Sequence, residues 1–478
     1  MIKGYISFLF MMILLACKGQ QIKNSGFEVE GGWHPGYNSN ENITIDREEK
    51  FCGKKSLLIN NKESKLSYCN QTFNYTCEAF EKIFIKFHVK GILDEASTIN
   101  LWVNSYNKRK ILYSIPIKSN ESIPQWKEMS LSLILPPETD GIQIGMSLNG
   151  KGRVWFDEFS LKKKTIEQQD TSYSRSTKKY ISEVVNIIKE HALNKDSLNY
   201  KQDVQKALKL SNFNEKKEYL SVRYLLRKLR DRHSAFIEKE EKSNSTNNVV
   251  DRSLPSGKIV QDSFAYIHLP TLSVTVDSFY HDYADTLYKT ITDLNKYVPK
   301  FWILDLRGNK GGVVWPMIAG LGPLLEDGIQ GYFVYRNSKR RPWIYKNGKA
   351  YSSKDSKFEI KDKNFNKIDR SNSRVLMLTD GTTASAAEMI AVMLRGYKNT
   401  LIVGKKSRGL TSGNSTFTLS DGSILRLTTS RYMDKNGKVY TGKIIPDIQI
   451  DLGVKEPLCV LPLDSLSEKA DQLLNLKR

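Results

Sequence analysis

Two stretches in the second half of the chain decide its fold, DLRGNKGG at residues 305–312 and TASAAE at residues 383–388. An apolar run leads into each stretch, as expected of a buried strand. Glycines in the first stretch let backbone N–H groups face a ligand, because residues without Cβ can adopt the required φ. Ser385 in the second stretch begins an amphipathic helix, where its hydroxyl is exposed, rigidly held and close to the positive end of the helix dipole. Together the two stretches predict a serine hydrolase with a nucleophile and an oxyanion hole.

A second interpretation is that the chain is an ordinary α/β protein in which Ser385 is only a helix N-cap. Strands and helices alternate over residues 258–452, and this alternation favours an α/β core with a largely parallel sheet in either case. A basic insertion at 336–373 interrupts the alternation, and we expect it to project as a hairpin and loop. The presence of both stretches in one chain, in this order, favours the hydrolase.

The segment before this core has a different periodicity. Residues 18–163 alternate apolar and polar side chains, as around Ile83 and Ile85, with turn residues between the runs. This pattern predicts an antiparallel β-sandwich. The order of its glycines and tryptophans resembles carbohydrate-binding jelly rolls, which implies a glycan ligand; a structural spacer or protein-binding module is the alternative. Residues 164–257 change to period 3.6 and predict a helical segment and linker, and 453–478 form a C-terminal tail.

Residues 1–17 predict an export signal. Lys3 precedes an apolar run at 6–15, and the small residue Ala16 stands before Cys17. The run is too short to span a bilayer comfortably. It also resembles a bacterial lipobox, which implies that Cys17 is lipidated and anchors the protein to a bacterial membrane, in the periplasm or on the cell surface. A plain signal peptide or a short anchor is the alternative.

Composition restricts the partners and cofactors. The 478 residues allow two or three domains, and 73 basic against 52 acidic residues give a formal charge of +21. The basic residues are spread widely, without a basic stripe or a DNA-binding motif, so we do not expect nucleic acid as a partner. A bridge between Cys69 and Cys77 is one pairing that the cysteines allow, although spacing does not decide connectivity. No Cys or His pair there has the spacing of a zinc site, and we expect no metal or organic cofactor.

A series of short motifs follows in a characteristic order between residues 170 and 452. It comprises DRHSAF at 231–236, YIHLP at 266–270, the stretches at 305–312 and 383–388, GKKSRGLT at 404–411, LSDGS at 419–423 and IPDI at 445–448. This series resembles the C-terminal processing (tail-specific) protease family, which also includes the tricorn core protease and interphotoreceptor retinoid-binding protein. The resemblance implies a ClpP/crotonase-like α/β peptidase core with Ser385 as nucleophile. It also implies that backbone N–H groups of Ala386 and Gly312 form the oxyanion hole.

Two departures from this family bear on the mechanism. Only about thirty residues separate His233 from Phe264, too few for the PDZ domain with which the processing proteases capture substrate tails, so we do not expect tail specificity. Leu410 stands where those proteases have a lysine base, and Asn414 where they have a supporting glutamine. The tricorn-like branch instead uses a histidine at the position of His233, and an imidazole with an ordinary pKa near 6.5 suits a general base.

These features predict an exported, lipid-anchored serine endopeptidase that hydrolyses proteins or peptides of the cell envelope. Ser385 would attack and His233 would accept its proton, with Glu388 or Asp231 as candidates for a third member. Activity should then rise through an apparent pKa of about 6 to 7. The alternative is a catalytically weak or inactive binding protein on the same fold, with an apolar ligand or a glycan.

Overall fold

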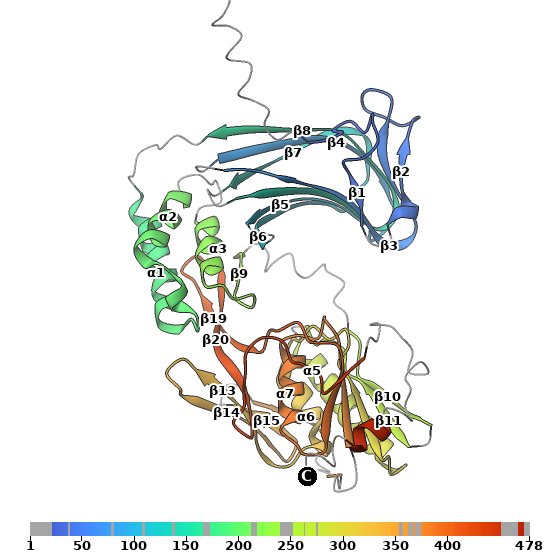
Figure 1. The fold of residues 1–478 in the computed structure, drawn as a ribbon, viewed down its shortest axis with the longest axis vertical. Helices are drawn as coiled ribbons and strands as arrows, with labels where there is room; N and C mark the ends of the chain where they lie inside the picture. The colour runs from blue at the N-terminus through green and yellow to red at the C-terminus, as the bar shows by residue number, and fades with distance from the viewer. Residues whose placement is uncertain are drawn as a thin grey trace, which may run out of the picture. The chain divides into compact units, whose positions relative to one another are not determined.

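The computed structural model describes part of the chain, which divides into two compact units, Met1–Ser172 and Tyr173–Arg478 (Figure 1). The described residues are 22–36, 39–77, 81–107, 110–135, 139–165, 173–211, 218–239, 252–261, 263–273, 276–352, 357–361, 367–368, 374–450 and 467–472. Cys17, the export signal and most of the predicted C-terminal tail lie outside them. No helix within the described ranges is long and apolar enough to cross a membrane.

The first unit consists of antiparallel strands, as the period-two pattern predicted. Its strands are β1 (His34–Pro35), β2 (Ile43–Asp46), β3 (Ser56–Asn74), β4 (Glu81–Leu93), β5 (Thr98–Asn107), β6 (Lys110–Ser119), β7 (Ile123–Leu135) and β8 (Gly141–Thr165). The long β8 pairs with β3, β4 and β5, so the two layers visible in Figure 1 share one network of hydrogen bonds. Alternate side chains such as Ile83 and Ile85 are fully buried. The jelly-roll topology stays a prediction.

The described cysteines of this unit are thiols. Cys69 and Cys77 are buried and Cys52 is exposed. Cys77 Sγ donates to the carbonyl of Leu135 at 3.6 Å, and burial raises the pKa of Cys69 to about 12. The Cys69–Cys77 bridge that the sequence allowed is therefore not formed.

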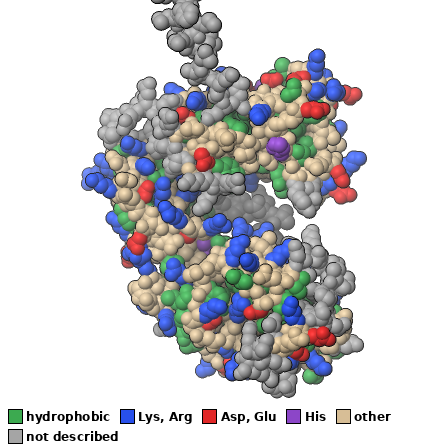
Figure 2. Space-filling model, viewed as in Figure 1, with side chains coloured by type: hydrophobic (Ala, Val, Ile, Leu, Met, Phe, Trp, Pro, Cys, Tyr) green, Lys and Arg blue, Asp and Glu red, His purple; other side chains and the backbone are tan. Residues whose placement is uncertain are grey.

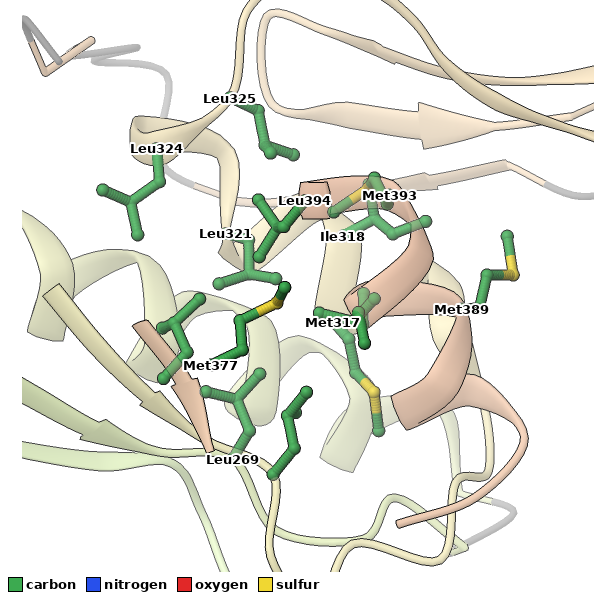
Figure 3. Close-up of a cluster of buried hydrophobic side chains, with 14 of the residues drawn as sticks. Leu269, Met317, Ile318, Leu321, Leu324, Leu325, Met377, Met389, Met393 and Leu394 are labelled. Carbon is green, nitrogen blue, oxygen red and sulfur yellow. The ribbon is translucent and has the colours of Figure 1, made fainter. Parts of the chain in front are cut away.

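A six-stranded sheet lies at the centre of the second unit. Its order is β10 (Ser256–Val260), β11 (Phe264–His268), β12 (Phe301–Asp305), β17 (Arg374–Thr379), β18 (Thr400–Gly404) and β22 (Ile448–Gln449), with every pair after the first parallel. Helices α5 (Asp277–Asn295), α6 (Val314–Gly320) and α7 (Ala386–Arg395) follow β11, β12 and β17. Figure 3 shows apolar side chains of α6 and α7, among them Met317 and Leu394, in one buried cluster with Met377 of β17. The α/β core with a largely parallel sheet is as predicted, whereas its ClpP/crotonase-like classification stays a prediction.

A second, antiparallel sheet supplies one side of the site described below. Its order is β16 (Lys357–Glu359), β15 (Lys349–Tyr351), β14 (Arg340–Lys346), β13 (Gly328–Tyr335), β20 (Ile424–Asp434) and β19 (Ser412–Thr418), and β9 (Ala235–Ile237) and β21 (Val439–Tyr440) also pair with β20. The insertion at 336–373 thus contributes three strands to a sheet. β14 and β15 form the expected hairpin, but together with β16 they extend the sheet beyond β13, and the basic, polar sequence of the insertion gave no sign of this pairing.

The predicted helical segment belongs to the second unit. It forms α1 (Arg175–His191), α2 (Tyr200–Ser211) and α3 (Tyr219–Lys228), whose apolar stripes are buried. The N-terminus of α1 is capped because Ser174 Oγ accepts a hydrogen bond from the Thr177 N–H at 3.0 Å. After α3 the chain turns into β9, which pairs with β20. This pairing brings the turn that contains His233 beside β19 and β20 (Figure 1).

Candidate active site

Ser385 stands at a sharp turn between β17 and α7. Its backbone has φ +53° and ψ −113°, a combination that residues with a side chain rarely adopt, so the turn is strained and depends on its surroundings. The Ser385 N–H donates to Glu388 Oε2 at 2.9 Å, and the Ala384 N–H donates to the carbonyl of Asn309 at 3.0 Å. A strained strand-to-helix turn is the local structure that presents a nucleophilic serine in many hydrolases.

The turn after α3 brings His233 to the same place. Its Nε2 lies 3.0 Å from Ser385 Oγ, and its Nδ1 lies 2.9 Å from Ser412 Oγ. The His233 backbone is also held, because its N–H donates to Asp231 Oδ1 at 3.0 Å and its carbonyl accepts from Asn414 Nδ2 at 3.2 Å. The two residues predicted as nucleophile and base therefore lie within hydrogen-bonding distance, although 152 positions separate them.

Burial governs the protonation of His233. Loss of contact with water lowers its pKa to about 4; the negative charge of Asp231 opposes this effect only in part, and Arg426 adds to it. The imidazole is therefore neutral at pH 7, which is the state in which Nε2 can accept a proton. This value is lower than the 6 to 7 expected from a solvated imidazole.

Glu388, one of the two candidates for a third member, lies under the serine turn. Its side chain is fully buried, and besides the Ser385 N–H it accepts hydrogen bonds from Ser407 Oγ and from the N–H groups of Gly409 and Leu410. Burial raises its pKa, while these hydrogen bonds lower it in part. None of its hydrogen bonds within the described residues goes to the His233 ring. Glu388 thus connects the serine turn to residues 407–410.

The other candidate, Asp231, contacts the backbone of His233 and not its ring. Besides the His233 N–H, its carboxylate accepts from the Ser234 N–H at 2.6 Å and from Thr428 Oγ1 at 3.1 Å. Ser412 occupies the position beside Nδ1 where a third member would lie. Ser412 was not among the residues expected at the site, because it lies one residue beyond the motif that ends at residue 411.

The glycine turn after β12 lies against the serine turn. Gly311 and Gly312 have φ +98° and +116°. A Cβ on Gly311 would lie 2.8 Å from Ser385 Cβ, and one on Gly312 would lie 1.8 Å from the carbonyl oxygen of Leu272, so no larger residue fits. Within the described part of the chain, the N–H groups of Gly312 and Ala386 donate to no protein acceptor, which leaves both for a ligand.

A cleft of about 820 Å³ opens over these groups. Ser385, His233, Gly312 and Ala386 line it, and an apolar part is formed by Trp315, Phe333, Met389 and Tyr432. No cluster of His, Cys, Asp or Glu among the described residues is suited to hold a metal ion. The cleft combines a hydroxyl, a neutral imidazole and two unused N–H groups, which are the groups that acyl transfer requires.

The comparisons with known proteins agree with this chemistry. Residues 263–450 match the family profile described as Peptidase family S41. This part of the chain is an S41 peptidase domain. Membership of the C-terminal processing protease family, predicted from the motif series, is thus confirmed, and the family is one of serine-type peptidases.

Two curated relatives share the S41 domain. A nisin-resistance protein from Lactococcus lactis subsp. lactis is 36% identical over 174 residues, which are 36% of this chain and 52% of that protein. The carboxy-terminal processing protease CtpA from Bacillus subtilis is 27% identical over 205 residues, 43% of this chain and 40% of the protease. The chain therefore spans about half the length of the first relative and less of the second.

A solved structure shares the fold. It is described as a lipoprotein from Streptococcus agalactiae, is 22% identical in sequence and superposes with a TM-score of 0.50. The likeness covers 64% of this chain and 99% of the lipoprotein chain.

Proposed function

We propose that this chain is a serine endopeptidase that hydrolyses peptide bonds in proteins or peptides of the cell envelope. The observation that carries the proposal is the 3.0 Å distance between His233 Nε2 and Ser385 Oγ, two groups from distant parts of the sequence. Both lie in one cleft with the unused N–H groups of Gly312 and Ala386. A neutral imidazole beside a partly exposed hydroxyl is the arrangement that activates serine for attack.

In the proposed mechanism Ser385 Oγ attacks the scissile carbonyl carbon while His233 Nε2 accepts the hydroxyl proton. The oxyanion of the tetrahedral intermediate accepts hydrogen bonds from the N–H groups of Ala386 and Gly312. The C–N bond breaks as the imidazolium returns the proton to the leaving amine, which leaves an acyl ester on Ser385. Water, deprotonated by the same nitrogen, hydrolyses the ester and restores the free serine.

Ser412 orients the base in this mechanism. Its Oγ accepts the Nδ1 proton of His233, which leaves the lone pair of Nε2 directed at Ser385. A hydroxyl stabilises an imidazolium less than a carboxylate would, because it carries no charge. The third member is thus a neutral group, in place of Glu388 or Asp231.

The relatives support a protein or peptide substrate. One is named for the processing of carboxy termini and the other for resistance to nisin. Tail specificity is not part of the proposal, because too few residues between His233 and Phe264 remain for a tail-binding domain. Attachment to a bacterial membrane through a lipid on Cys17 is part of it and rests on the sequence of residues 1–17. Cys17→Ser should release the protein from membrane fractions.

A binding protein on the same fold is the second candidate, and one observation favours it. No carboxylate within the described residues hydrogen bonds to the His233 ring, as expected of a weakened catalytic site. The ligand would be apolar, in the cleft beside Phe333, or a glycan on the first unit.

A serine-reactive fluorophosphonate probe tests the proposal. Full-length protein should be labelled on Ser385, and labelling should disappear in Ser385→Ala but not in Ser114→Ala, an exposed serine of the first unit. Hydrolysis of casein should follow the same pattern. Absence of labelling and of hydrolysis between pH 5 and 9 would overturn the peptidase and favour the binding protein.

A further inference from the structure

Two cavities meet at His233, and both are lined by positive charge. The cleft over Ser385 contains Lys310, Arg341 and Arg426 and no carboxylate. A second cavity of about 380 Å³ also contains His233. The cations of this second cavity are Arg230, Arg232, Arg408, Arg431 and Lys443, and Asp231 is its one acidic residue.

This imbalance exceeds what the composition of the chain explains. The whole chain has 73 basic and 52 acidic residues, and Lys and Arg occur over much of the face seen in Figure 2. A basic surface is therefore not by itself evidence of a site. The two cavities, however, have eight cations against one carboxylate. Acidic side chains are depleted specifically around the proposed catalytic histidine.

No carboxylate of the described residues is paired with these cations. Asp231 accepts hydrogen bonds from the His233 and Ser234 backbone and from Thr428, so its carboxylate is already engaged. Within the described residues, none of the eight cations forms an ion pair with a carboxylate. Arg341 rests over the ring of Tyr335 at 5.6 Å, and Arg426 is close enough to His233 to lower its pKa.

The cations come from separate elements that converge on the cleavage site. Lys310 lies in the glycine turn, next to Gly311, and its backbone N–H is held by Thr271 Oγ1 at 2.8 Å. Arg426 and Arg431 lie on β20, where Arg431 is the cross-strand neighbour of Ser412. Arg408 precedes Gly409, in the segment that Glu388 holds. A peptide that extends from the Ser385 cleft past His233 would therefore meet positive charge on both sides of the scissile bond.

We propose that the substrate of the Ser385 site is an acidic peptide segment, an inference that rests on the proposed peptidase function. An apolar residue of the substrate packs against Phe333, Trp315 and Tyr432, and Asp or Glu residues that flank it pair with the cations. A positively charged cleft raises the rate at which acidic partners encounter it and disfavours basic partners. A carboxylate-bearing peptide is chosen over other polyanions because the cavities adjoin the nucleophile and the apolar part of the cleft.

Three matched fluorogenic peptides test this inference with the full-length protein. They share one apolar core, which is flanked by Glu, by Gln or by Lys. We expect kcat/KM to fall in the order Glu, Gln, Lys, with at least a tenfold difference between the first and the last at 50 mM salt. The difference should shrink at 500 mM salt. The Debye length is about 10 Å at 0.1 M and shorter at higher salt, so the charges of the cleft are then more strongly screened from those of the peptide.

Charge reversal identifies the residues involved. Arg341→Glu should lower kcat/KM for the Glu peptide and raise it for the Lys peptide. Arg340→Glu is the matched control, because it makes the same charge change on the adjacent residue of β14, which does not line the cleft. Its selectivity should stay within twofold of the wild type.

The two proposals fail in distinguishable ways. If the probe labels Ser385 but the Glu peptide is cleaved no faster than the Lys peptide, only the acidic-substrate inference is overturned. If Arg341→Glu and Arg340→Glu change selectivity equally, net charge and not the cleft is responsible, and the inference is likewise overturned. If neither labelling nor cleavage occurs, the peptidase function itself fails.

Discussion

His233 Nδ1 lies 2.9 Å from Ser412 Oγ, at the position where many serine hydrolases place a carboxylate. The partner of the imidazole is therefore a neutral hydroxyl. Burial outweighs the opposing negative charge of Asp231 and lowers the pKa of His233 to about 4. This relationship makes the pH dependence of activity a direct test of the site.

Wild-type kcat/KM should be nearly constant from pH 6 to pH 8. The neutral imidazole is the active form, so activity is lost only as pH falls through the pKa of His233, about 4. The measurement is a pH profile with a fluorogenic peptide, limited to the range in which circular dichroism shows a folded protein. An acid limb centred between pH 6 and 7 would contradict the burial of the imidazole.

Substitutions at Ser412 should distinguish its effect on the orientation of the His233 ring from the effect of a charge on the pKa of His233. Ser412→Asp places a negative charge beside Nδ1, which raises an imidazole pKa by about 1 to 3 units and should move the acid limb to higher pH. Ser412→Ala removes one hydrogen bond worth ~1 kcal/mol, or about fivefold in kcat, and should leave the limb nearly in place. Ser420→Ala, on an exposed loop, is the control. Identical limbs in Ser412→Asp and wild type would mean that Ser412 does not act on the imidazole.

Removal of the base should be more costly than removal of neighbouring lysines. His233→Ala should lower kcat by about a hundredfold or more, the usual contribution of general-base catalysis. Lys405→Ala and Lys406→Ala should leave kcat nearly unchanged, because both residues are exposed and neither lines the cleft over Ser385. The measurement is kcat of the three variants from steady-state kinetics. Activity that survives in His233→Ala and is lost with either lysine would assign the base to a lysine.

Glu388→Gln should weaken the serine turn. The carboxylate accepts four hydrogen bonds, two on each oxygen. An amide replaces one of these oxygens with an NH2 donor. That donor would face either the N–H groups of Ser385 and Leu410 or the Ser407 hydroxyl and the Gly409 N–H. Lost hydrogen bonds to a buried charge cost roughly 1.5–3 kcal/mol each, so we expect a lower Tm together with slower labelling of Ser385. Glu190→Gln, an exposed carboxylate on α1, should change neither. Wild-type labelling in Glu388→Gln would show that the strained turn does not depend on this carboxylate.

Gly312→Ala should impair catalysis through the backbone. The new Cβ would lie 1.8 Å from the carbonyl oxygen of Leu272, so the turn must move and carry its N–H away from the proposed oxyanion position. We expect a loss of kcat of about a hundredfold, as for removal of one oxyanion donor. Gly437→Ala is the matched control, since Gly437 also has positive φ but its Cβ would contact nothing within 4 Å. A fall in Tm in both variants with a fall in kcat only in Gly312→Ala is the expected result.

Much of the fold was predictable because its signals are local. The alternation around Ile83 and Ile85 predicted strands, and the period of 3.6 in residues 181–229 predicted helices, since each pattern reflects which face of one element is buried. The hairpin that β14 and β15 form was expected, but its addition to the sheet beside β13 was not. Strands of this length gain their hydrogen bonds from neighbours such as β13, which a local pattern does not reveal.

The sequence by itself determined the two turns of the site. The glycine pair after one apolar run and the place of Ser385 before an apolar helix are visible in neighbouring residues, although the groups that exclude a Cβ at the glycines lie far away in sequence. Only the tertiary structure decided the partners of His233 and its protonation. Ser412 lies 179 positions away in sequence, and the low pKa of the imidazole arises from burial beneath several elements. Hydrogen bonds and desolvation depend on distances in space, and these exist only once the chain has packed.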